Sequence, residues 1–315
     1  MEGNPVIRKI GDLFADSRVV GLDIGPTAVK MAEVAQSDEG LMLCRATVAD
    51  IDRENLSELL KRVVFENGFK TRQVALGISS PELVVQLFQF PRMPKNEMIS
   101  AIELEAEHAI LNGHALEKMA VDWHLLNGYA NSGDFIRGLL AVVPKEALSG
   151  QIQLAKTAGL DPLIVDVKSL ALWNAYWTLL GKQGPVSRTV LLIHLDVHTT
   201  HFVIVQGAET LLLARDIQLG TASLQKDKDT WFSELNDSLV YARSQGGLRR
   251  IEAVCVTGAC TNEILGRISS ALGVPARLWN PLDHISYNKS NGTALAHSQG
   301  PLLAVAIGLA LRKLN

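Results

Sequence analysis

Two aspartates at the ends of apolar, β-rich runs are the side chains with the clearest chemical potential in this sequence. Asp23 ends a run that begins at Val19, and Asp196 ends a run that begins at Leu191. Each is followed by a turn and a second β-rich run, which is typical of a hairpin. A carboxylate there can hold a hydrated Mg²⁺ while turn amides and hydroxyls face a phosphate. Because the pattern occurs twice, it predicts a nucleotide clamped between duplicated halves.

The first turn has the better residues for this chemistry. Gly25 allows the backbone to approach phosphate oxygens, Thr27 offers a hydroxyl and Lys30 offers a cation. An ordinary turn, in which the Asp23 side chain bonds to the backbone, is the alternative interpretation.

Length and composition indicate a two-domain globular protein. The chain has 315 residues, of which 47% are hydrophobic and 20% charged. A net charge of −3 gives no indication of nucleic-acid binding. The three scattered cysteines suit a reducing compartment. No apolar run approaches the roughly 18–20 residues that span a bilayer, so we expect a cytoplasmic protein without direct membrane insertion. A short amphipathic helix is expected over 7–14.

The elements that must position these residues follow from periodicity. The first hairpin leads into a strand at 41–48, a helix at 54–67 and a strand at 73–78. A different order begins at residue 83 and predicts a small α+β module. Its elements are a strand at 83–90, a helix at 94–110, strands at 120–126 and 136–143, and a helix at 144–158.

Beyond the module, we expect a strand at 163–167, an apolar helix at 169–180 and a hinge at 181–188. The second hairpin follows. We then expect a strand at 214–220, a helix at 230–244, a strand at 253–257, a helix at 258–271, a strand at 274–278 and a terminal helix at 301–313.

This order resembles the actin/heat-shock-protein/sugar-kinase superfamily, and within it the PilM family of type IV pilus assembly proteins. The likeness covers nearly the whole chain. It is carried by Gly21-Leu22-Asp23-Ile24-Gly25, Val29-Lys30, Met93-Pro94, Ala101-Ile102-Glu103, Glu105-Ala106-Glu107, Asp166, Leu170-Ala171-Leu172, Asp196, Thr199-Thr200, Ala214-Arg215-Asp216-Ile217, Tyr241-Ala242-Arg243-Ser244-Gln245, Thr257-Gly258, Asn280-Pro281 and Ala304-Val305-Ala306-Ile307-Gly308-Leu309-Ala310.

The resemblance implies an α/β fold of duplicated actin-like (ribonuclease H-like) domains with a small α+β subdomain inserted in the first half. The expected parts are an N-terminal segment 1–18, a first half 19–81 and 159–184, an inserted subdomain 82–158 and a second half 185–315. The terminal helix 301–313 is in a position to pack back on the first half.

The resemblance also implies ATP or ADP with Mg²⁺ in the cleft. The residues expected to contact the nucleotide are Asp23, Gly25, Thr27, Lys30, Asp196, Thr199, Thr200, Gly258 and Gly308, with Asp23 and Asp196 holding Mg²⁺ through water. Two turns depart from the family pattern. Aligned on the two aspartates, His198 stands opposite Gly25, and the adenosine turn Gly258-Ala259-Cys260 has one glycine where the family has several. These changes favour at most slow ATP turnover, and no catalytic residue is assigned.

Peptide capture is the function that the resemblance favours. In the family, a groove on the first half receives the cytoplasmic N-terminal peptide of PilN, an inner-membrane protein. We therefore expect this chain to be recruited to the inner membrane through its partners. Other pilus assembly proteins are further expected partners. An exposed strand edge beside a helix suits such a peptide. The expected contacts are Leu83, Val84, Val85, Gln86, Leu87, Phe88, Gln89 and Phe90.

Several alternatives remain open at this point. His194, Asp196 and His198, with His201 nearby, allow a transition-metal site, but a hydrogen-bonded core histidine is the preferred interpretation of His194. Glu103 and Glu107 are interpreted as a solvated pair rather than a catalytic dyad. Competing functions are a small-molecule kinase with Asp196 as general base, an FtsA-like membrane tether of cell division, and a related secretion or DNA-uptake machine.

Overall fold

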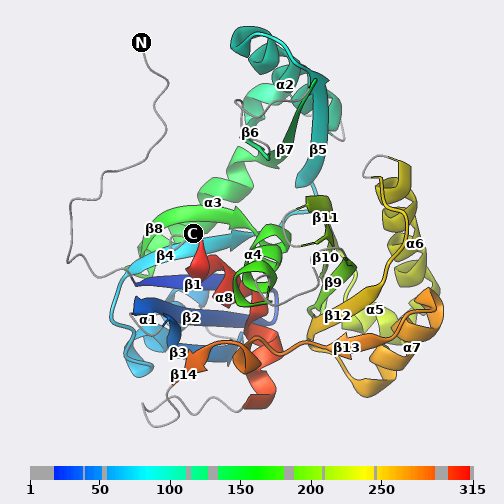
Figure 1. The fold of residues 1–315 in the computed structure, drawn as a ribbon. Coiled ribbons are helices and arrows are strands. Elements are labelled where there is room, and N and C mark those ends of the chain that lie inside the picture. The colour runs from blue at the N-terminus through cyan, green and yellow to red at the C-terminus, as the bar shows by residue number, and fades with distance from the viewer. Residues whose placement is uncertain are drawn as a thin grey trace.

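The described residues of this computed structural model are 18–37, 40–51, 55–110, 115–126, 134–180, 188–207, 210–244, 247–287 and 297–312. They form two large sheets, each covered by helices, and a smaller sheet that stands above the first (Figure 1).

The first sheet has six strands in the order β14-β3-β2-β1-β4-β8. β1 is antiparallel to β2 and parallel to β4, which is parallel to β8. β1 is almost wholly buried because both faces of the sheet are covered. The bounds are β1 Val19–Ile24, β2 Ala28–Ser37, β3 Gly40–Asp50, β4 Gln73–Ile78, β8 Asp161–Val167 and β14 Ser286–Tyr287.

The second sheet has five strands in the order β11-β10-β9-β12-β13. β9 is antiparallel to β10 and parallel to β12, as β1 is to β2 and β4. The order and directions of five strands therefore repeat those of the first sheet, which confirms the predicted duplication. The bounds are β9 Thr189–Leu195, β10 Thr200–Gln206, β11 Thr210–Ile217, β12 Ala253–Gly258 and β13 Ala276–Leu278.

Helices cover the outer face of each sheet. Buried Leu59, Leu60 and Val63 of α1 share an apolar cluster with Val20 and Leu22 of β1. Trp231 and Leu235 of α6 pack in the corresponding cluster of the second half. The bounds are α1 Leu56–Glu66, α5 Thr221–Lys226, α6 Lys228–Ser244 and α7 Asn262–Leu272. The sequence did not predict α5, a helix of only six residues.

The inserted subdomain is a sheet in the order β5-β7-β6 with one helix, α2, packed on it. Its bounds are β5 Val84–Pro91, α2 Lys95–Ala109, η1 Leu116–Lys118, β6 Met119–Leu125 and β7 Phe135–Pro144. The next helix, α3 (Lys145–Thr157), places Ala155 in the apolar cluster of α1 and β1. We therefore assign α3 to the body, although the expected subdomain ran to residue 158.

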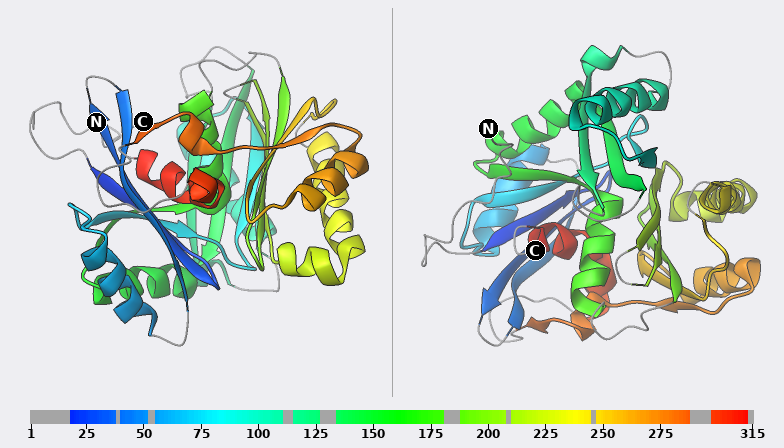
Figure 2. Two further views of the ribbon diagram at one scale, coloured as in Figure 1. Left: turned by 90° about the horizontal axis from the view of Figure 1, so that it is seen from below. Right: turned by 45° about the horizontal axis from the view of Figure 1, so that its top comes forward.

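Two apolar helices fill the space between the halves. α4 (Lys168–Leu180) and α8 (Ala304–Leu311) cross there, with α8 against β1 and α4 reaching β10 (Figure 2). All eight residues of α8 are buried. Glycines allow the close approach: a Cβ on Gly308 would lie 1.8 Å from Ala171 O, and one on Gly21 would lie 1.8 Å from Ala306 O.

The end of the chain returns to the first half. After β13, the turns η2 (Pro281–Asp283) and η3 (His297–Leu303) flank β14, which pairs with β3 of the first sheet. The spatial second half is thus shorter than the expected 185–315. The expected N-terminal helix at 7–14 and most of the expected hinge at 181–188 lie outside the described residues.

Candidate functional site

The predicted aspartates meet in a buried site where the two hairpins face each other. Asp23 lies near the end of β1, directly opposite Lys30 of β2. Asp196 is the first residue after β9, in the turn that leads to β10. Asp23 is completely buried, and Lys30 and Asp196 are almost so. A short β1–β2 turn, closed by the Gly25 amide donating to Ala28 O at 2.9 Å, holds the first pair in place.

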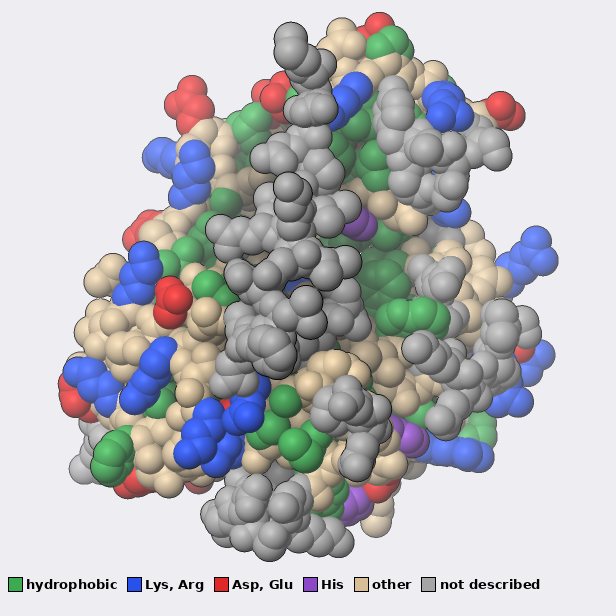
Figure 3. Space-filling model, turned by 60° about the vertical axis from the view of Figure 1, so that its left-hand side comes forward, with side chains coloured by type: hydrophobic (Ala, Val, Ile, Leu, Met, Phe, Trp, Pro, Cys, Tyr) green, Lys and Arg blue, Asp and Glu red, His purple; other side chains and the backbone are tan. Residues whose placement is uncertain are grey.

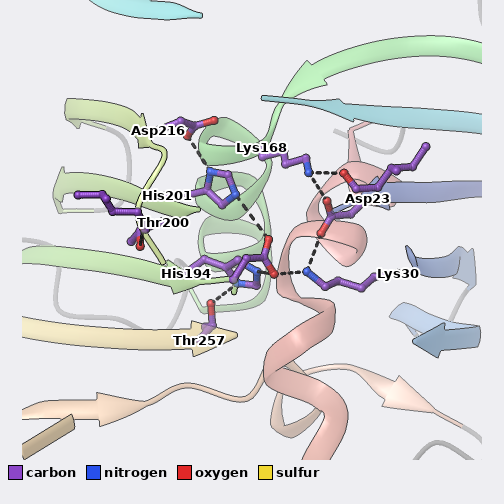
Figure 4. A network of polar contacts seen from close by, with 11 residues as sticks. Asp23, Lys30, Lys168, His194, Thr200, His201, Asp216 and Thr257 are labelled. Atoms are coloured by element: carbon purple, nitrogen blue, oxygen red, sulfur yellow. Dashed lines mark hydrogen bonds and ion pairs between the residues drawn. The ribbon is translucent and has the colours of Figure 1, made fainter. Parts of the chain in front are cut away.

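Lys30 contacts both carboxylates, and Lys168 contacts Asp23 (Figure 4). Lys30 Nζ donates to Asp196 Oδ1 and lies 3.4 Å from Asp23 Oδ2. Lys168, the first residue of α4, places its Nζ 2.7 Å from Asp23 Oδ1 and donates to Ile24 O at 2.7 Å. Lys30 therefore bridges the two halves, while Lys168 fixes Asp23 from a third element. Sequence reasoning missed Lys168. The only feature of the sequence that could have indicated it is that Lys168 is a single charged residue between an apolar strand and an apolar helix.

The charges of this set are mutually stabilised. Burial raises the pKa of Asp23, but Lys168 and Lys30 outweigh that effect and lower the pKa to about 2. Burial also raises the pKa of Asp196, and Lys30 lowers it well below its usual range. Burial lowers the pKa of Lys30, yet Asp23 and Asp196 raise it above its ordinary value. Both carboxylates and the Lys30 ammonium are thus charged at neutral pH.

Two buried histidines of the second half lie beside Asp196. His194 and His201 face each other on β9 and β10, with ring centroids 5.8 Å apart. His194 Nδ1 lies 2.7 Å from Thr257 Oγ1, and His201 Nδ1 lies 2.8 Å from Asp216 Oδ1. Their Nε2 atoms lie 3.8 and 4.0 Å from Asp196 oxygens and have no hydrogen-bond partner among the described residues. Burial lowers the pKa of His194, which favours its neutral form.

The strand registers correct the expected alignment of the two turns. In the first hairpin, Ile24 pairs with Val29 and the Gly25 amide closes the turn on Ala28. In the second, Leu195 pairs with Thr200 and the Asp196 amide closes the turn on Thr199 at 2.9 Å. Asp196 therefore corresponds to Gly25, not to Asp23. His198 does not occupy that position, and it is exposed in the turn.

By the same registers, His194 corresponds to Asp23, and His201 corresponds to Lys30. Aligning the aspartates was wrong because a shift of two residues keeps the side chains on the same face of a strand. The alternation of apolar and polar residues cannot detect such a shift.

The remaining predicted contacts are scattered. Thr27 and Thr199 are partly exposed in the two turns. The Thr200 hydroxyl donates to Leu219 O at 2.6 Å and accepts from Trp231 Nε1 at 3.0 Å, so both its bonds are made within the second half. Gly258 has a φ of 84° beside Leu195, where a Cβ would lie 2.1 Å from the Leu195 carbonyl oxygen. Gly308 lies at the crossing of α8 with α4 and is required there by packing.

The expected ligands fit this buried site unequally. Asp23, His194 and Asp196 place ligand atoms within 4.8 Å of one another, which is close enough for a metal ion. However, Lys30 contacts both carboxylates and Lys168 contacts Asp23, so a cation would have to displace an ammonium. The lysines suit a phosphate, but Asp196 puts a carboxylate where the first turn has glycine. The depressed pKa of Asp196 also makes it a poor general base for the kinase alternative.

Comparisons with known proteins agree with this architecture. The profile of the family described as type IV pilus assembly protein PilM matches residues 21–238. A solved PilM-PilN type IV pilus biogenesis complex is similar with a TM-score of 0.80 at 22% identity, covering 94% of this chain and 98% of that chain. A Bacteroides thetaiotaomicron protein with actin-like ATPase fold and unknown function has a TM-score of 0.49 at 11% identity, covering 84% and 92%.

The cytoplasmic domain of EpsL, an inner membrane component of the type II secretion system of Vibrio cholerae, has a TM-score of 0.48 at 9% identity, covering 91% of this chain and 94% of that chain. The duplicated sheets and the similarity to the PilM-PilN structure define a protein of actin-like fold. Because the family profile matches more than half of its length, the chain belongs to the PilM family of type IV pilus assembly proteins.

Proposed function

We propose that this chain is a scaffold of type IV pilus assembly that binds the cytoplasmic N-terminal peptide of a PilN-like inner-membrane protein. The observation that carries the proposal is an apolar groove between the inserted subdomain and the body. The similarity to a solved PilM-PilN complex over almost the whole chain supports the choice of partner. In the part of the chain that is described, no helix has the length and apolar character to cross a membrane. Recruitment through the partner would bring this protein to the inner membrane.

The groove has the chemistry that an extended peptide needs. It has a volume of about 370 Å³ and lies between β6, α3 and the β7 and β8 strands. Within the described residues, β6 pairs only with β7, and β8 only with β4, so each has one free edge. An extended segment can add to such an edge by backbone hydrogen bonds and place alternate side chains in apolar pockets. The apolar lining includes Val121, Ala141, Val143, Leu148, Ile152 and Leu170.

Polar side chains stand at the rim of this groove. Asp166 lies beside Arg312, with Arg312 Nε 3.2 Å from Asp166 Oδ2, and Asp122 and His124 come from β6. Figure 3 shows hydrophobic side chains at the surface in several places on this side of the molecule. An apolar centre with a polar rim is the usual anatomy of a protein interface.

The predicted contacts 83–90 lie mostly on another surface. Leu83 lines the apolar groove, but 86–89 line a polar hollow of about 580 Å³ with Thr210, Leu211 and Tyr241 of the second half. Val85 and Leu87 also pack against the central apolar cluster. A peptide that inserts apolar side chains is better served by the apolar groove, so we place the proposed site there.

The test measures binding of a synthetic PilN-type N-terminal peptide by fluorescence anisotropy. Val121 is 38% exposed on β6, so Val121→Lys places a charge in the groove without disturbing the core. We expect this variant to lower the affinity at least about tenfold, because a charged group in an apolar pocket must be desolvated.

Gln89→Lys introduces the same side chain at an exposed position of the polar hollow and serves as the matched control. It should bind the peptide as the unsubstituted protein does. Loss of binding in Gln89→Lys alone would move the site to β5, and unchanged binding in both variants would reject both surfaces.

A further inference from the structure

The second half has a buried anion, Asp196, at the hairpin position where the first half has Gly25. Gly25 and Asp196 occupy the same step of their hairpins, as the registers show. A Cβ on Gly25 would lie 3.2 Å from Ala28 O, a tight contact that a shift of a few tenths of an ångström would relieve. In the second turn, the Asp196 amide donates to Thr199 O at 2.9 Å, as the Gly25 amide does to Ala28 O in the first. The aspartate at this position gives the second turn a negative charge that the first turn lacks.

The Asp196 carboxylate already has the partners that an oxyanion would take. Its Oδ1 accepts from Lys30 Nζ, which comes from the opposite half of the molecule, and Lys168 lies behind Asp23 in the same network (Figure 4). Two carboxylates and two ammonium groups make the set electrically neutral. A phosphate entering beside Asp196 would add negative charge to this buried set, whose two ammonium groups are already paired, and that is costly at low dielectric.

We propose that Asp196 occupies a latent oxyanion site, so that the two halves are held together by the protein's own carboxylate instead of a polyphosphate ligand. Lys30 and Lys168 are the cationic side of that site, and the β1–β2 and β9–β10 turns form its walls. Removing the carboxylate opens the site to the phosphates of a nucleotide or of inorganic pyrophosphate. This inference does not depend on the peptide site proposed above.

The experiment compares binding of Mg-ATP, Mg-ADP and pyrophosphate to the full chain and to Asp196→Gly, by calorimetry and by the ligand-induced rise in Tm. We expect the unsubstituted chain to bind all three weakly. Asp196→Gly should bind at least one of them about tenfold more tightly or better, because a repelling charge has been removed. Adding Lys30→Met to Asp196→Gly should abolish the gain, since the ammonium is then lost as well.

Val197→Gly is the matched control, because it loosens the same turn and leaves the carboxylate in place. It should show no gain in affinity. Asp196→Asn removes the charge but preserves the size of the side chain, so it serves as the second variant if Asp196→Gly fails to fold. It should also gain affinity. Tight binding by the unsubstituted chain, an equal gain in Val197→Gly, or no gain in either folded Asp196 variant would overturn the proposal. A gain for nucleotides but not for pyrophosphate would still support it and would identify the base as a further contact.

Discussion

At the scale of single residues, the site where the two hairpins meet consists of buried ionisable groups whose charge depends on their neighbours. His194 is the clearest case. It is fully buried, contacts Thr257 and faces Asp196, Lys30 and His201, and burial lowers its pKa. In the unfolded chain a histidine takes up a proton near pH 6.5. The unfolded state therefore binds more protons below this pH, and the folded state is destabilised as the pH falls.

We predict that the free energy of unfolding decreases from pH 7 to pH 5, by at most about 1.4 kcal/mol per pH unit for this one group. The pKa of Asp23 is about 2 and that of Asp196 is also depressed, so their stabilisation is complete above about pH 4 and is lost only below it. The window from pH 5 to pH 7 thus lies above the range in which Asp23 and Asp196 lose their stabilisation.

Denaturant unfolding at pH 5, 6 and 7 measures this effect, and His194→Gln should flatten the dependence. His198→Gln changes an exposed histidine of the neighbouring turn and should leave the slope as it is. An identical slope in the unsubstituted protein and in His194→Gln would show that another group is responsible.

At the scale of elements, the crossing of α4 and α8 sets the distance between the two halves. Gly308 is the residue that permits it, because a Cβ there would lie 1.8 Å from Ala171 O. The Gly308 carbonyl also accepts from Asn174 Nδ2 at 2.7 Å, which ties the two helices at the same level. Backbone cannot yield as a flexible side chain can, so an added methyl must push the helices apart.

Gly308→Ala should therefore destabilise the protein by about 1–3 kcal/mol, the usual cost of overpacking. Gly266→Ala is the matched control: it lies on an exposed face of α7, and an added Cβ would have no neighbour within 4 Å. It should stabilise by up to about 1 kcal/mol, because alanine is the better helix former. Thermal unfolding of both variants measures the contrast, and a stabilising Gly308→Ala would contradict the assigned role.

At the scale of the whole molecule, the first half is completed by the end of the chain. β14 adds to β3, and α8 covers β1, β2 and β4. α8 is apolar on all sides and wholly buried, and among the described residues no other helix covers the surface of β1 and β2 that it packs on. The two halves are therefore not independent pieces that a cut near the predicted hinge would separate.

A chain that stops at residue 278 should be poorly soluble and lack a cooperative thermal transition, because it exposes the apolar surface that α8 covers. Soluble yield and circular dichroism measure this. Co-expression of residues 279–315 as a separate fragment should restore both properties. A cooperative transition of the truncated chain by itself, at the Tm of the full chain, would show that α8 is dispensable.

How far the sequence determined these features depends on the kind of signal. Strands such as β4 and β9 and amphipathic helices such as α1 were predicted within a few residues, because period-2 and period-3.6 patterns are local properties. The duplication and the importance of Asp23 and Lys30 were also readable, since both halves carry an apolar run, a polar residue and a turn. The sequence did not predict the short α5 or the packing of α3 against the body, because both depend on tertiary contacts.

The sequence by itself determined the actin-like duplication and the importance of Asp23, Lys30 and Asp196 where the two halves meet. Only the tertiary structure decided that Asp196 corresponds to Gly25, that Lys168 joins Asp23, and that Lys30 bridges the halves. The physical reason is that strand alternation determines only the face of the sheet on which a side chain lies. Hairpin register and the contact between Lys30 and Asp196, which are 166 positions apart, depend on hydrogen bonds between segments and on burial. Those long-range contacts pair the Asp196 carboxylate with Lys30 where the two halves meet.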